Sequence, residues 1–150
     1  MELEIHVNNE EQTKRFAENL AKTLPGGVNI GLIGELGAGK TTFTRHLVAA
    51  LGIDAPVSSP TYVLEHQYDG KFLVHHWDLY RLSFAPEDLF EPVSEAEIRL
   101  IEWADKFESL LSDLDLLISF HYVLDQLKMR TIKLSGKILA DIRQSIEKWD

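Results

Sequence analysis

The sequence predicts an α/β fold in which a central mixed β-sheet is flanked by helices. Short apolar runs of strand length alternate with stretches in which apolar residues recur at helical spacing. The apolar share of 45% and the charged share of 26% are typical of a globular protein with a packed core. A chain of 150 residues is long enough for one domain and short for two. We therefore expect a single domain spanning residues 1–150.

The first third of the chain predicts a helix, a strand and a second helix. Asn9 is a candidate N-cap, because acids follow it directly and apolar residues then recur at helical spacing as far as the Pro-Gly-Gly at 25–27. Residues 28–33 are an apolar run that predicts a buried strand. A glycine-rich loop comes next, and residues 41–51 have a helical pattern closed by a glycine.

The rest of the chain predicts mainly strands. Apolar runs flanking Asp69-Gly70 are a strong hairpin signal. An irregular acidic stretch opens near Pro86. The predicted elements, in chain order, are strands at 62–68, 72–77, 98–103, about 114–122 and 129–134, then a helix from about residue 137.

Residues 34–41 read Gly-Glu-Leu-Gly-Ala-Gly-Lys-Thr and stand between the predicted strand and the predicted helix. A glycine-rich turn can aim backbone N–H groups at phosphate, and so can the start of the following helix. In this pattern Lys40 reaches the β- and γ-phosphates, and Thr41 offers its hydroxyl to Mg²⁺. The sequence therefore predicts a single P-loop NTPase domain that binds ATP with Mg²⁺.

Metal binding and hydrolysis also need carboxylates, and two acids are well placed because each ends an apolar strand beside this loop. They are Asp78 and Glu102, and together with Lys40 they are the candidate catalytic residues. His75 and His76 should face opposite sides of one strand, so they cannot chelate a metal together. We interpret these histidines as packing or surface residues.

The charge and composition limit the partners and the compartment. A net charge of −9 without a basic run disfavours tight binding to nucleic acid and favours a protein partner. The absence of cysteine excludes disulfides and thiolate metal sites. The first residues lack the signal-peptide pattern, and no apolar run reaches the roughly 18 residues of a membrane span. We expect a soluble, cytoplasmic protein that does not associate with membranes.

Four motifs occur in order along the chain, namely GELGAGKTTF at 34–43, SPTY at 59–62, DLYR at 78–81 and IEW at 101–103. This set resembles the bacterial TsaE (YjeE) family over nearly the whole chain. Members of that family are ATPases required for making threonylcarbamoyladenosine in tRNA, next to the anticodon. The resemblance implies ATP and Mg²⁺ as cofactors. It also implies two partners, TsaD for the transfer chemistry and TsaB as its scaffold, with ATP hydrolysis, weak in the isolated protein, resetting their complex.

The resemblance also implies roles for individual residues. The implied ATP site consists of Thr13, Gly37, Ala38, Gly39, Lys40, Thr41, Thr42, Trp103 and Arg130. Thr41 and Glu102 would hold Mg²⁺, and Asp78 would act on hydrolysis through water or metal. Ser59 and Thr61 belong to a segment that behaves like a switch loop. The chain departs from the family at residues 83–97, which lack the usual glycine and carry two prolines, so partner contacts there need not follow the family.

Three alternative functions share the phosphate-binding loop. A small-molecule kinase normally has an arginine-rich lid, but acids dominate between Asp78 and Glu102. A GTPase is disfavoured because the chain has no Asn-Lys-x-Asp run. A module that uses nucleotide for interaction without significant hydrolysis stays open. Phosphate release with and without TsaB and TsaD would separate that module from an ATPase.

Overall fold

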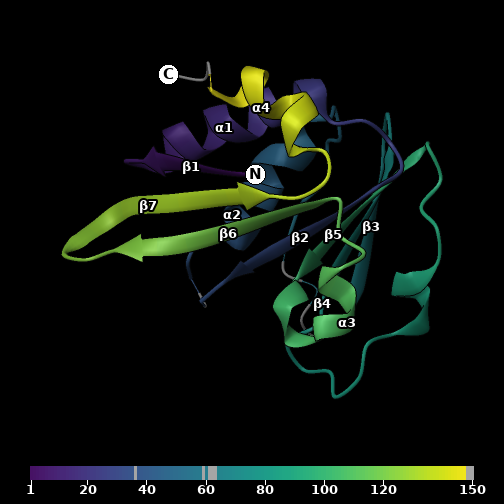
Figure 1. Ribbon diagram of the computed structural model, residues 1–150. Helices are drawn as coiled ribbons and strands as arrows, with labels where there is room; N and C mark the ends of the chain where they lie inside the picture. Colours follow the sequence, from purple (N-terminus) through teal and green to yellow (C-terminus); the bar gives the residue numbers. More distant parts are fainter. Residues whose placement is uncertain (36, 59, 61–63, 148–150) are drawn as a thin grey trace.

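The protein is described by a computed structural model that covers residues 1–35, 37–58, 60 and 64–147. A seven-stranded sheet runs through it in the order β1-β7-β6-β2-β5-β4-β3 (Figure 1). The strands are β1 Glu2–Val7, β2 Val28–Gly34, β3 Glu65–Asp69, β4 Leu73–Asp78, β5 Glu97–Glu102, β6 Leu116–Val123 and β7 Gln126–Ser135. The helices are α1 Glu10–Thr23, α2 Lys40–Ala50, α3 Glu108–Leu111 and α4 Leu139–Glu147, with 3₁₀ helices at Glu87–Phe90 and Ala104–Lys106.

The sheet is mixed, as predicted. Strands β6, β2, β5 and β4 run parallel to their neighbours in this series, whereas β3, β7 and β1 are added antiparallel at the two sides. The carboxyl ends of β2, β4 and β5 therefore lie at the same edge of the sheet. In α/β sheets this edge is where ligands bind.

Most of the predicted elements are confirmed. The carboxamide oxygen of Asn9 accepts the N–H of Gln12 at 3.0 Å, so Asn9 caps α1. The hairpin around Asp69-Gly70 is formed by β3 and β4. Strand β1 was not among the predicted elements, although Leu3 and Ile5 alternate with exposed residues in the pattern of an edge strand. Its pairing with β7, at the other end of the chain, supplies its hydrogen bonds.

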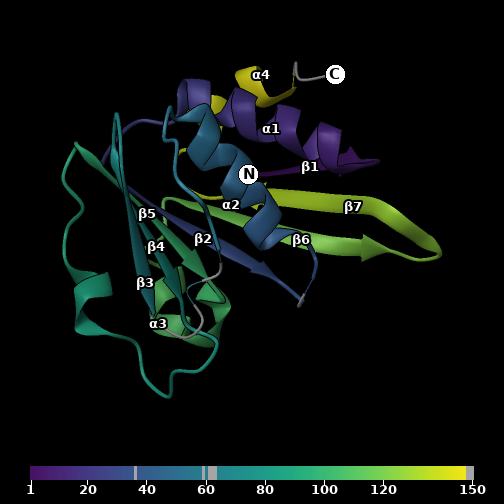
Figure 2. The same cartoon turned by 180° about the vertical axis from the view of Figure 1, so that it is seen from behind.

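Helices α1 and α2 lie over one face of the sheet, and the short α3 lies on the other face (Figures 1 and 2). The larger core cluster joins α1, α2 and α4 to the sheet, with the rings of Phe16 and Phe43 5.4 Å apart. Because strand residues alternate between faces, Val74 of β4 belongs to this cluster, whereas Trp77 belongs to the smaller cluster on the opposite face. His76 and Asp78 therefore face α2.

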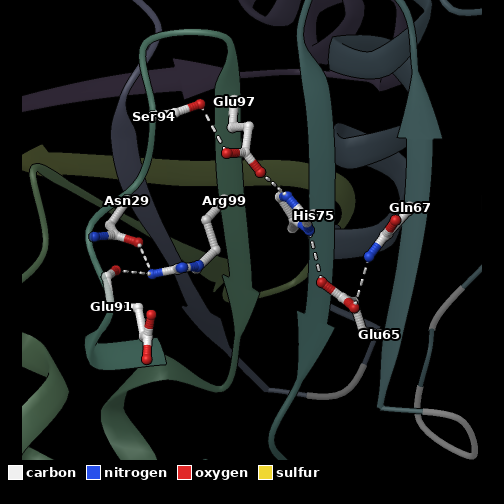
Figure 3. Close-up of polar contacts among 8 residues, drawn as sticks. All are labelled: Asn29, Glu65, Gln67, His75, Glu91, Ser94, Glu97 and Arg99. Carbon is white, nitrogen blue, oxygen red and sulfur yellow. Dashed lines mark hydrogen bonds and ion pairs between the residues drawn. The ribbon is translucent and has the colours of Figure 1, made fainter. Parts of the chain in front are cut away.

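The acidic segment 83–97 is largely irregular, as predicted, apart from the 3₁₀ helix Glu87–Phe90. It is fixed to the sheet by Arg99 of β5, whose guanidinium donates to the carbonyl oxygens of Leu89 and Glu91, each at 3.2 Å. Nη1 of Arg99, the nitrogen that makes both of these contacts, also donates to Oδ1 of Asn29 at 3.0 Å (Figure 3). Across the described residues, no helix has the length and apolar character needed to span a membrane.

Candidate functional site

The glycine-rich loop connects the end of β2 to the start of α2, the context predicted for a phosphate-binding loop. Gly34, Gly37 and Gly39 have φ values of 146°, 78° and 117°, in the region that favours glycine. A Cβ at Gly34 would lie 2.7 Å from the carbonyl oxygen of Phe120, so a side chain would also clash there. The first N–H groups of α2 have no partners within the helix and are available to a phosphate.

Lys40 begins α2 and extends its side chain back along this loop. The residue is 5% exposed, and its ammonium donates to the carbonyl oxygens of Gly34 and Glu35. The same ammonium lies 4.3 Å from the centre of the Trp103 ring. Burial lowers the pKa of Lys40 below 10.5, and nearby carboxylates, that of Glu102 foremost, partly oppose the shift. Phosphate oxygens would compete with the two carbonyls for this ammonium.

The two predicted acids lie side by side. Asp78 and Glu102 are opposite each other in the parallel register of β4 and β5, and each is 2% exposed. One carboxylate oxygen of Asp78 accepts the N–H of Tyr80 at 2.9 Å. Oε1 of Glu102 lies 3.5 Å from the hydroxyl of Thr41. The structure thus groups the predicted catalytic and metal residues on the α2 side of the sheet edge.

The oxygens of Thr41 and Glu102 are of the chemical type that a magnesium ion requires. Hydroxyl and carboxylate oxygens are the hard ligands that Mg²⁺ prefers, at about 2.0–2.1 Å. Octahedral ligands at that length stand about 2.9 Å apart when adjacent and about 4.1 Å apart when opposite, so the observed 3.5 Å falls between the two spacings. The two oxygens would have to approach by about 0.6 Å to bind one ion as adjacent ligands. The described residues contain no cluster of three or more His, Cys, Asp or Glu that could hold a metal ion. The ion would therefore need phosphate oxygens and water to complete its shell.

A cavity of about 490 Å³ adjoins the loop, between the start of α1 and strand β7. Most of the ATP-site residues implied by the family resemblance lie around it. Its lining residues are Asn9, Glu10, Glu11, Thr13, Gly37, Ala38, Gly39, Thr42, Phe120, Leu127, Lys128 and Arg130. The cavity is large enough to receive the base and sugar of a nucleotide whose phosphates lie on the loop.

Arg130 contacts the loop directly. Its Nε donates to the carbonyl oxygen of Ala38 at 3.1 Å, and its guanidinium lies 4.5 Å from the centre of the Tyr122 ring. A second nitrogen is 3.5 Å from the carbonyl oxygen of Gly37. The hairpin of β6 and β7 therefore contacts the carbonyls of Gly37 and Ala38 through Arg130.

Trp103 lines a different cavity from Thr13 and Arg130. It borders a second cavity, of about 450 Å³, and its ring centre is 4.8 Å from that of Tyr80. Its contact with Lys40 places it beside the part of the loop that would hold the phosphates. Trp103 and Thr13, which the family resemblance assigns to one nucleotide site, thus line separate cavities. Ser59 and Thr61, the predicted switch residues, lie outside the described residues.

The sequence interpretation of His76 as a packing or surface residue missed a polar contact. Its Nε2 lies 2.5 Å from Oε2 of Glu102, and the two side chains are 0% and 3% exposed. The sequence does contain one indication that His76 belongs to the site. It lies two residues before Asp78, so both side chains are on one face of β4. The partner across the strand becomes apparent only from the register of β4 and β5.

Comparisons with known proteins agree with this geometry. The sequence profile of the family described as "Threonylcarbamoyl adenosine biosynthesis protein TsaE" matches residues 7–132. The chain is 39% identical over 116 residues to the tRNA threonylcarbamoyladenosine biosynthesis protein TsaE of Haemophilus influenzae, covering 73% of each chain. It is 40% identical over 106 residues to the protein of the same name from Bacillus subtilis, covering 69% of this chain and 67% of the relative.

The fold also matches a solved structure. The crystal structure of Bacillus subtilis YdiB superposes with a TM-score of 0.80 and 28% identity, covering 99% of this chain and 95% of the other. The profile match, the two relatives and the shared fold are consistent with one another. The chain therefore belongs to the TsaE family of threonylcarbamoyl adenosine biosynthesis proteins.

Proposed function

We propose that this chain is a Mg²⁺-dependent ATPase that supports threonylcarbamoyladenosine modification of tRNA by acting on a complex of TsaB and TsaD. TsaE proteins are a P-loop ATPase family with a role in this modification. The observation that carries the proposal is the grouping of the loop, the buried Lys40 and the Thr41–Glu102 pair at one sheet edge. Phosphoryl transfer depends mainly on such positioning and charge neutralisation.

Different residues of the site have different roles in the proposed reaction. Backbone N–H groups of the loop and of the start of α2 bind the phosphates, and Lys40 neutralises charge on the β- and γ-phosphate oxygens. Thr41 and Glu102 would hold Mg²⁺, which would neutralise further phosphate charge when bound. Asp78, buried beside Glu102, would orient the water for hydrolysis. The cavity lined by Thr13 and Arg130 receives the nucleoside.

The metal role of Glu102 is tested with Glu102→Gln, which keeps the shape of the side chain and removes its charge. We expect Mg²⁺-dependent binding of an ATP analogue to weaken roughly tenfold or more, while Mg²⁺-free ADP binding changes little, because a neutral amide is a poorer Mg²⁺ ligand. Isothermal titration calorimetry measures both. Glu97→Gln, on the opposite face of β5, is the matched control. Equal losses for both ligands would show that Glu102 is structural.

The chemical step is tested by phosphate release with and without TsaB and TsaD. An ATPase that resets the complex should release phosphate faster when both partners are present. Tight Mg²⁺-dependent binding of ATP to the three-protein mixture without phosphate release would instead support the non-hydrolysing interaction module.

A further inference from the structure

We propose that His76 is a positioning residue that holds Glu102 in place for the metal, and that Tyr68 in turn fixes the imidazole of His76. The inference rests on the proposed function in one respect, because it takes Glu102 to be a metal ligand. It assigns a role to a buried polar network that the proposed mechanism does not otherwise use.

The two oxygens of Glu102 have different surroundings. Oε1 faces the hydroxyl of Thr41 at 3.5 Å, and Oε2 is bound by Nε2 of His76 at 2.5 Å. Because both side chains are almost completely buried, water does not offer Oε2 an alternative donor. His76 therefore fixes one oxygen while the other stays directed toward Thr41. A carboxylate that binds a metal depends on such partners for its orientation.

The imidazole of His76 is itself held by a hydrogen bond. A carboxylate only accepts, so Nε2 of His76 carries the proton, and in the neutral ring Nδ1 then accepts. The hydroxyl of Tyr68, 3.3 Å away, is the donor to Nδ1. Tyr68 is 5% exposed, and burial raises the pKa of its hydroxyl further above the ordinary value of 10.0. The hydroxyl therefore carries its proton at neutral pH and can donate it.

The network continues to the loop that follows α2. Nδ1 of His66 lies 3.3 Å from the Tyr68 hydroxyl and 3.2 Å from the carbonyl oxygen of Ser58. Residues on β3, β4 and β5 are thus connected in series, all on the face toward α2. The hydrogen bonds lead from Ser58 across three adjacent strands to Glu102.

The opposite face of the same strands provides a natural control. His75 bridges the same strands through Oε2 of Glu65, at 2.7 Å, and Oε2 of Glu97, at 2.5 Å (Figure 3). The two histidines are neighbours in sequence, and each binds a carboxylate of β5. They differ in orientation, because His75 faces away from α2 and His76 faces toward it. If His76 only stabilised the sheet, replacing it, like replacing His75, should not weaken Mg²⁺-dependent binding selectively.

The experiment compares His76→Leu with His75→Leu by calorimetry, using a non-hydrolysable ATP analogue with Mg²⁺ and ADP without Mg²⁺. We expect His76→Leu to weaken Mg²⁺-dependent binding by about 10- to 100-fold, the range typical of residues that orient metal ligands, with ADP binding little changed. His75→Leu should leave both affinities within about twofold. His76→Gln should restore much of the loss, because its amide N–H can donate to Oε2 of Glu102.

Tyr68→Phe removes a single hydroxyl from the network and should weaken Mg²⁺-dependent binding by a few-fold. If His76→Leu does not fold, Tyr68→Phe replaces it as the test variant. Unchanged Mg²⁺-dependent binding in a folded Tyr68→Phe protein would then overturn the proposal. Equal effects of His76→Leu and His75→Leu, or equal losses with both ligands, would also overturn it.

Glu102→Gln in the same series separates the metal role of Glu102 from the positioning role of His76. If it leaves Mg²⁺-dependent binding intact, the metal role of Glu102 fails. If it impairs that binding while His76→Leu does not, the positioning role alone fails.

Discussion

At the scale of single residues, Lys40 combines burial with a positive charge. Its ammonium is removed from bulk water and bonded to two backbone carbonyls of the loop. Desolvation disfavours the charged form, which is why the pKa of Lys40 lies below its ordinary value of 10.5. Phosphate oxygens would relieve this cost, so the unoccupied loop is expected to be less stable than the nucleotide-bound loop.

This burial predicts a pH dependence of stability. In the folded protein Lys40 loses its proton at a lower pH than in the unfolded chain, so the unfolded state binds more protons between the lowered pKa and 10.5. The free energy of unfolding of the nucleotide-free protein, measured relative to Lys40→Met, should therefore rise as the pH increases through that window. Urea unfolding at a series of alkaline pH values measures it. A difference that is constant or falls with pH would contradict the burial of the charged ammonium.

The candidate site was predictable to the extent that its residues follow from local sequence. Lys40 and Thr41 belong to a loop pattern with fixed spacing, and Asp78 and Glu102 were predictable because each ends an apolar strand. The role of His76 depends on the register between β4 and β5 and on the burial of its side chain. The alternation of side chains along β4 alone determines neither of these. The position of Trp103, beside Lys40 and away from Thr13, likewise depends on packing between elements.

At the scale of elements, Arg99 joins the acidic segment 83–97 to the sheet. Its buried guanidinium donates to two carbonyls of that segment and to Asn29 of β2. The segment has little regular structure of its own, so these hydrogen bonds replace the missing backbone ladder. The sequence predicted an irregular segment but not its anchor, because the carbonyls that the Arg99 guanidinium reaches depend on how the segment folds back against β5. Strand β1 was missed for a similar reason, since its partner β7 lies at the other end of the sequence.

Arg99→Met should therefore destabilise the protein by about 2–4 kcal/mol, because it leaves the buried carbonyl of Leu89 and the part-buried carbonyl of Glu91 without this donor. Denaturant unfolding followed by circular dichroism measures the change. Arg143→Met is the matched control. Arg143 forms an exposed pair with Glu147 in α4, and its loss should cost no more than about 0.5 kcal/mol. Equal effects of the two substitutions would show that Arg99 does not anchor the segment.

At the scale of the whole molecule, the seven-stranded order and the superposition on YdiB confirm the predicted α/β class. A mixed sheet with helices on both faces was predictable because the alternation of apolar runs and helical patterns is local. One domain over residues 1–150 stays a prediction. The whole-molecule property with the clearest functional consequence is the net charge of −9. Such a charge repels the phosphate backbone of nucleic acid.

The isolated protein should accordingly not bind tRNA tightly, even though its family acts in tRNA modification. Filter binding or anisotropy at low and moderate salt tests this, and we expect affinities weaker than about micromolar at physiological salt. Submicromolar binding that weakens steeply with salt would require a basic surface that the composition does not suggest.

The most direct test of the central claim is phosphate release by the folded Lys40→Ala protein in the presence of TsaB, TsaD and tRNA. Circular dichroism first establishes that this variant retains the wild-type fold. If the loop at residues 34–41 is the ATPase site, the variant should lose most of the partner-stimulated phosphate release, by about 100-fold or more, because neutralisation of the phosphates is lost. Wild-type rates of phosphate release in a folded Lys40→Ala protein would contradict the assignment of the site.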